Sequence, residues 1–101
     1  MGNREDLHEL LKELLGSTNV YYDPPASITM KYDAIKYSLN DITTKNANDR
    51  KYFGMNRYEV IVITKLPDRP IVKSILDLQY CSFDRHYTSD NLHHYVFTLY
   101  Y

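Results

Sequence analysis

The stretch RYEVIVITKLPDRPIVKSILDL, residues 57–78, decides the fold of this chain. Its first part runs through four consecutive β-branched apolar residues, from Val60 to Ile63, which favour a strand that is apolar on both faces. Such a strand lies inside a sheet and needs a helix over at least one face. After a proline-containing turn, apolar residues recur at helical spacing, with Asp68 as the predicted cap and Pro70 in the first turn. The stretch therefore predicts a central strand followed by a helix.

A second amphipathic helix is predicted at about residues 3–15. Asn3 is the expected N-cap, and Gly16 suits the left-handed position that ends a helix. His8 falls outside the apolar stripe, so we expect it at the surface. The leucines that share this stripe are three, four, seven and eight positions apart: Leu7, Leu10, Leu11, Leu14 and Leu15.

The remaining segments complete an antiparallel sheet. Alternation of apolar and polar residues in DAIKYSL, residues 33–39, predicts a half-buried strand. The polar segment at about 40–56 predicts a long loop, and its outer parts are expected to extend the flanking strands. Residues 80–101 are predicted to form a C-terminal hairpin. We therefore expect one α+β domain over residues 1–101, a mainly antiparallel sheet of about four strands with two helices packed on it.

Composition limits the classes of function. The net charge of −1 provides no general positive field, so we expect no direct sequence-specific nucleic-acid binding. No apolar run is long enough to span a bilayer, and we expect no membrane partner. The single cysteine rules out an internal disulfide framework. Eleven tyrosines and no tryptophan suit half-buried strands and protein interfaces.

The segment CSFDRHYTSDNLHHYVFTLYY, residues 81–101, raises the question of a nucleophile, because it holds the only cysteine and three of the four histidines. The apolar pattern favours an odd-numbered turn near Thr88, which places Cys81 opposite Phe97 on the core face. Cys81 and His86 are five residues apart, so they lie on opposite faces of one strand and cannot form a dyad. We therefore predict a structural cysteine and no catalytic residue.

A metal site is the second chemical interpretation of the hairpin. The odd turn gathers Asp84, His86 and His94 on the polar face, and an even turn would gather Asp84, His86 and His93. Two imidazoles and a carboxylate are acceptable zinc ligands. A flat exposed face offers no cavity, however, so we predict no metal ligand and no cofactor there. Solvent or a neighbouring subunit is expected to cover it.

The four quoted segments together carry a resemblance to a known family. They are VYYDPP from Val20, MKYDAIKYSL from Met30, the strand–turn–helix stretch and the C-terminal hairpin segment. In this order they resemble the small tail-completion or tail-terminator proteins of long-tailed bacteriophages, close to those of phages and prophages of Gram-positive bacteria. The resemblance covers nearly the whole chain and contains no catalytic signature.

The resemblance implies a structural function. Family members are α+β domains that assemble into a ring, commonly hexameric, which caps the tail tube and offers a docking face to the head connector. We thus expect a non-enzymatic homo-oligomer in the virion, at the head–tail interface, with assembly in the bacterial host cytoplasm. Its expected partners are the tail tube protein and a head-completion or connector protein. The alternatives are another connector, adaptor or minor tail protein and, further away, a small binding domain or a metal or thiol enzyme.

The long loop is the expected contact region within the assembly, by its position between the first two main strands. A ring requires two different complementary patches on each subunit, and we expect the loop, whose charges are mixed in sign, to serve as one of them. The candidate interface residues are Lys45, Asp49, Arg50, Lys51 and Arg57.

Overall fold

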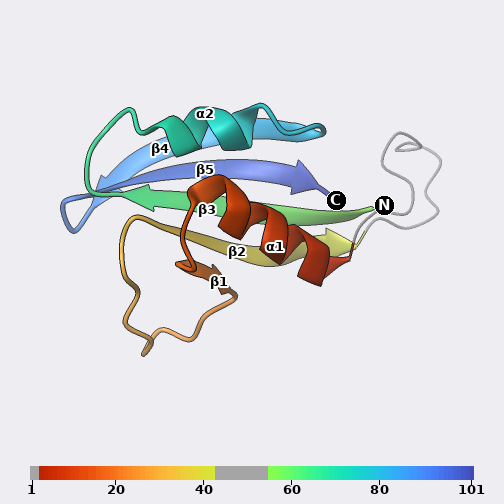
Figure 1. Cartoon of the computed structure of the whole chain (residues 1–101), viewed down its shortest axis with the longest axis horizontal. Helices are drawn as coiled ribbons and strands as arrows, with labels where there is room; N and C mark the ends of the chain where they lie inside the picture. The colour runs from red at the N-terminus through yellow and green to blue at the C-terminus, as the bar shows by residue number, and fades with distance from the viewer. Residues whose placement is uncertain (1–2, 43–54) are drawn as a thin grey trace.

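The computed structural model describes residues 3–42 and 55–101, which form a five-stranded sheet with two helices (Figure 1). The order across the sheet is β1-β2-β3-β5-β4; β1 and β2 are parallel and the other neighbours antiparallel. The α+β prediction is confirmed, with a mixed five-stranded sheet in place of about four antiparallel strands. The elements are α1 (Arg4–Leu15), β1 (Val20–Tyr22), β2 (Ala34–Ile42), β3 (Asn56–Thr64), α2 (Pro70–Leu76), β4 (Cys81–Ser89) and β5 (Leu92–Tyr100).

Strand β3 lies between β2 and β5, as its doubly apolar sequence predicts. Val60 and Val62 belong to the larger buried cluster, on the side where the helices lie. Ile61 and Ile63 belong to a smaller cluster on the opposite side. The alternation of side chains along one strand thus supplies both layers of the core.

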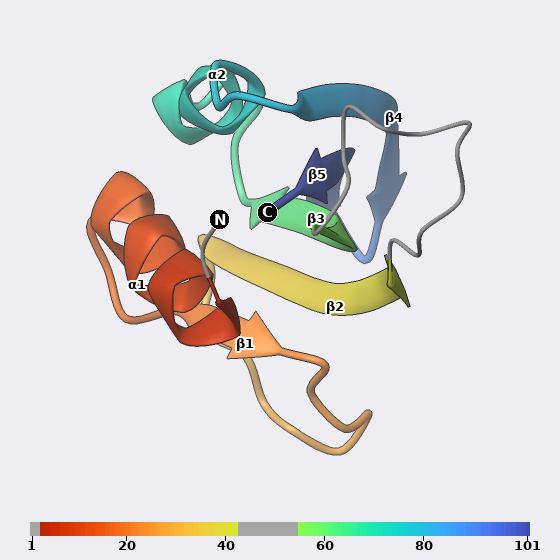
Figure 2. The ribbon, with the colours of Figure 1, turned by 90° about the vertical axis from the view of Figure 1, so that its right-hand side faces the viewer.

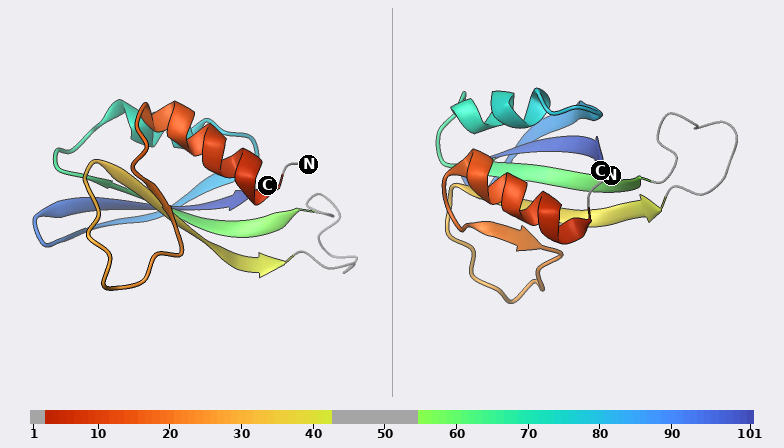
Figure 3. Two further views of the ribbon diagram at one scale, coloured as in Figure 1. Left: turned by 60° about the horizontal axis from the view of Figure 1, so that its bottom comes forward. Right: turned by 45° about the vertical axis from the view of Figure 1, so that its right-hand side comes forward.

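Both helices cover the same face of the sheet (Figures 2 and 3). Leu7 and Leu11 of α1 are completely buried there. The predicted ends of α1 are confirmed: the Asp6 amide donates to Asn3 Oδ1 at 2.8 Å, and Gly16 has the left-handed φ of 73°. A sheet face and two apolar helix faces therefore exclude water together.

The predicted cap of α2 is wrong. The helix begins at Pro70, and Arg69 occupies the N-cap position without a side-chain capping bond. Asp68 has a φ of 58° and belongs to the preceding turn. Proline has no amide hydrogen to satisfy and its φ is fixed near the helical value, so the helix starts there without a side-chain cap.

Strand β1 is an element that the sequence analysis did not predict. Its three residues pair in parallel with β2, with Val20 opposite Ile35. Three residues are too few to show an alternating pattern. The segment 23–33 then leads back to the start of β2, and its Met30 and Tyr32 pack on the smaller core cluster.

The predicted surface position of His8 is wrong. Its ring is half-buried, and its Nδ1 lies 2.7 Å from the hydroxyl of Tyr37, a residue with only 1% exposure. A buried hydroxyl needs a hydrogen-bond partner, and α1 crosses the sheet where His8 can supply one. Burial lowers the pKa of His8 and raises that of Tyr37. The guanidinium of Arg4 lies beside this pair, over the ring of Tyr22 and 4.5 Å from its centre.

Candidate assembly surface

Strand β4 forms one edge of the sheet, and its residues Cys81–Ser89 are called the β4 edge below. Every residue from Ser82 to Ser89 is exposed, and within the described part of the chain only β5 pairs with this strand. Phe83 and Tyr87 keep 48% and 39% of their surfaces exposed. A long edge strand with exposed aromatic side chains offers both backbone hydrogen-bonding groups and apolar surface to another chain.

The hairpin turn corrects the predicted register. Asp90 and Asn91 form a two-residue turn with φ of 54° and 64°, the conformation of a type I′ hairpin. The predicted odd-numbered turn is therefore wrong. A register shift between Phe83 and Arg85 marks a β-bulge at Asp84. Because the bulge adds one residue to β4, the apolar residues at the open end of the hairpin still face the core despite the even turn.

Cys81 lies at this open end, opposite Leu99, and packs half-buried against the larger core cluster. Burial raises the pKa of its thiol to about 11, which disfavours the nucleophilic thiolate. The bulge places Cys81 and His86 on the same face, contrary to the prediction. Their partners on β5 are Leu99 and Tyr95, so the two residues are still about 14 Å apart along the strand. This placement agrees with a structural cysteine.

The acidic ligand of the metal hypothesis does not join the histidines. The carboxylate of Asp84 contacts the guanidinium of Arg85 at 2.6 Å. His94 lies on the opposite face from His86, because His86 is directly opposite Tyr95 and His94 is the next residue along β5. In residues 3–42 and 55–101, no group of three or more His, Cys, Asp or Glu side chains is placed to hold a metal ion.

The even turn does bring two imidazoles together. His86 Nε2 and His93 Nδ1 are 3.2 Å apart, and the His86 ring stacks on Tyr95 with ring centres 4.6 Å apart. On the other face, Tyr87 stacks on His94 at 4.7 Å. Sequence reasoning reached the His86–His93 combination only as the less favoured register, because alternation alone cannot show a bulge.

Four of the five predicted interface residues, Lys45, Asp49, Arg50 and Lys51, lie outside the described residues. Arg57 lies on β3, in register between Asp41 on β2 and Tyr100 on β5. It is half-buried within the sheet, so its position is that of a strand residue and not of a loop tip.

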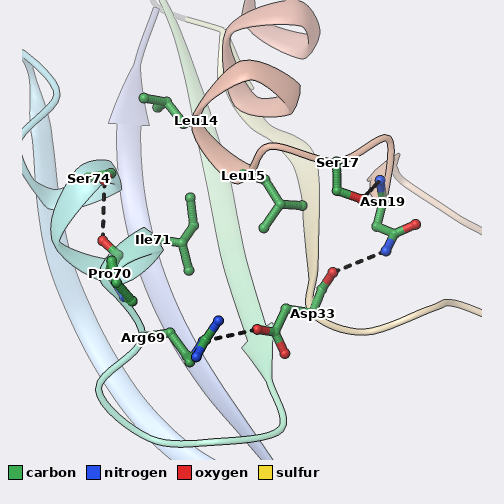
Figure 4. A pocket seen from close by; sticks show the side chains of 9 residues that line it. All are labelled: Leu14, Leu15, Ser17, Asn19, Asp33, Arg69, Pro70, Ile71 and Ser74. Carbon is green, nitrogen blue, oxygen red and sulfur yellow. Dashed lines mark hydrogen bonds and ion pairs between the residues drawn. The ribbon is translucent and has the colours of Figure 1, made fainter.

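A cavity of about 320 Å³ lies between the end of α1 and the start of α2 (Figure 4). Leu14, Leu15 and Ile71 form its apolar part. The carboxylate of Asp33 and the guanidinium of Arg69, 3.4 Å apart, lie at its polar end, and Asp33 also accepts from the Lys65 amide at 3.0 Å. Figure 2 shows β4 and α1 on opposite sides of the molecule, so this cavity and the β4 edge face different directions.

Comparison with family models, curated proteins and solved structures found no match to this chain. Among the described residues, no helix is long and apolar enough to cross a membrane.

Proposed function

We propose that this protein is a structural assembly protein of a long-tailed bacteriophage, and specifically a tail terminator. Its ring caps the finished tail tube and joins it to the head connector. The protein acts in the virion at the head–tail interface, after assembly in the bacterial host cytoplasm. The tail tube protein and the connector or head-completion protein are its partners beside its own copies.

The observation that carries the proposal is the β4 edge. Eight consecutive residues from Ser82 onward are exposed on an edge strand, and two of them are large aromatics. Monomeric proteins usually shorten, cover or charge such an edge, because it invites pairing with another chain. The edge has one ion pair, Asp84 with Arg85, whose charges cancel. It therefore suits permanent contact with a neighbour.

A ring needs two different surfaces on each subunit that fit one another. The β4 edge is the first. The second is the opposite side of the molecule, where the cavity between α1 and α2 offers an apolar recess beside the Asp33–Arg69 ion pair. In the proposed ring, the β4 edge of each subunit meets the cavity side of the next.

The first prediction concerns assembly on tail tubes. Phe83→Lys combined with Tyr87→Lys places two like charges on the β4 edge, which opposes strand pairing and apolar contact. We expect the wild type to form rings on purified tail tubes in negative-stain electron microscopy. The double variant should remain monomeric by multi-angle light scattering and leave the tubes uncapped.

Ile28→Lys is the matched control, since Ile28 is 43% exposed in the segment between β1 and β2 and belongs neither to the β4 edge nor to the lining of the cavity. This variant should cap tubes as the wild type does. A wild-type protein that stays monomeric and leaves tubes uncapped would contradict the proposed function. Equal capping by the wild type and the double lysine variant would contradict the assigned surface.

A further inference from the structure

The two neighbouring imidazoles of the hairpin have a geometry that the proposed assembly function does not use. His86 pairs in register with Tyr95, so His93 is its diagonal neighbour on β5. Diagonal side chains on one sheet face start about 7–8 Å apart, a distance that two imidazole rings can close. Tyr95 stacks on His86 at 4.6 Å and limits the freedom of its ring.

The facing nitrogens are 3.2 Å apart while the ring centres are 5.5 Å apart, with an angle of 11° between the ring planes. The rings are therefore displaced mainly sideways, and they meet edge to edge through His86 Nε2 and His93 Nδ1. Neutral imidazoles in this arrangement share one N–H···N hydrogen bond, in which one ring donates and the other accepts.

We propose that His86 and His93 form a binding site for a divalent transition metal ion, with zinc as the reference ion. Two nitrogens bound to one tetrahedral zinc at 2.0–2.1 Å lie about 3.3 Å from each other, which matches the observed separation. Water fills the remaining positions, because the site is exposed on the side of His86. Imidazole is a preferred ligand of zinc, copper and nickel, so these ions are the expected class.

Metal binding requires a change of tautomer and no other chemistry. The proton of the N–H···N bond moves to the far nitrogen of the same ring, so that both facing nitrogens present a lone pair. Both imidazoles stay neutral and no proton is released. The charge of the bound dication is balanced by anions in solution. In the observed pair the facing nitrogens point at one another, so both rings must rotate before their lone pairs meet at a metal position beside the N···N line.

The second prediction tests this site by isothermal titration of tag-free protein with zinc chloride. We expect saturable binding of one zinc ion per chain. His86→Ala and His93→Ala should each lower the affinity at least about tenfold, since removing only the hydrogen-bond partner of a ligand already costs that much. Zinc should also raise the melting temperature of the wild type more than that of these variants.

His94→Ala is the matched control, because His94 is a histidine of the same hairpin on the opposite face. It should bind zinc as the wild type does, and circular dichroism should show the same fold for all variants. Absence of saturable binding by the wild type would overturn the proposal. Wild-type affinity in His86→Ala, or an equal loss of affinity in His94→Ala, would overturn it as well.

Discussion

At the scale of single residues, the hydrogen bond between His8 and Tyr37 links the helix layer to the sheet. Tyr37 presents a hydroxyl inside the larger core cluster, and a buried hydroxyl without a partner costs about 1–3 kcal/mol. His8 therefore stabilises the packing of α1 on the sheet, because it gives this buried hydroxyl a hydrogen-bond partner. Its contribution depends on its charge, because burial disfavours the imidazolium.

The third prediction follows from the lowered pKa of His8. Below the unfolded pKa of about 6.5, the unfolded chain binds a proton that the folded protein resists, so the free energy of unfolding decreases as the pH falls. It decreases until the pH reaches the folded pKa. Urea midpoints measured between about pH 7.5 and pH 5.5 should fall in the wild type. Glutamine can hydrogen-bond but does not titrate in this range, so His8→Gln should flatten this slope.

The comparison variant for this prediction is His94→Gln, which removes a histidine from the hairpin and leaves the one on α1. Its urea midpoints should keep the wild-type dependence on pH. If the slope is unchanged in His8→Gln, the hydrogen bond to Tyr37 does not couple α1 to protonation.

At the scale of elements, the hairpin depends on two residues in left-handed conformation. The fourth prediction is that Asn91→Ala lowers the free energy of unfolding by about 1 kcal/mol, because Ala tolerates this region poorly. Asn91→Gly should not destabilise the protein in this way, since Asp-Gly is a preferred type I′ pair. Urea denaturation measures both. Equal losses would show that the Asn91 side chain, and not its φ, matters.

The bulge at Asp84 shows how the elements depart from simple alternation. On the turn side of the bulge, β4 reverses which residues face the helices. This reversal places Tyr87 beside His94 on one face and His86 beside His93 on the other. Without the bulge, an even turn would direct the apolar residues at the open end away from the core.

At the scale of the whole molecule, α1 is attached to the sheet by a small number of fully buried leucines. The fifth prediction is that Leu11→Ala, at a site with 0% exposure, lowers the free energy of unfolding by about 2–5 kcal/mol. Such a loss is a large part of the stability of a small domain. Leu66→Ala, at 60% exposure, should change it by less than about 0.5 kcal/mol. Chemical denaturation of both variants compares them directly, and similar losses would refute the assigned packing of α1.

The general architecture could be predicted from the sequence where local patterns are long. The leucine stripe of α1 and the run Val60–Ile63 each extend over enough residues to define a face. The run is confirmed, and four of the five stripe leucines pack in the larger cluster, Leu10 being the exception. β1 could not be found because three residues carry no period. The position of His8 depends on Tyr37, a residue 29 positions away, and such a contact has no local signal.

The hairpin shows the same limit for the candidate surface. Alternation correctly placed Cys81 with the apolar residues at the open end, where the strand is regular. It failed beyond Asp84, because one bulged residue changes the face of every residue that follows. β4 is exposed because it is the last strand in the order across the sheet. The sequence of one strand does not show where that strand lies in the sheet.

The position of β5 has a consequence for the order of folding. It is the last of the five strands along the chain, yet it lies between β3 and β4. Its pairing joins Val60 with Phe97 and Phe83 with Phe97, so a growing chain leaves one backbone edge of β3 and one of β4 unpaired until β5 has been synthesised. During translation, the sheet therefore closes only when β5 pairs with both neighbours, and shortening β5 would leave two strands unpaired at once.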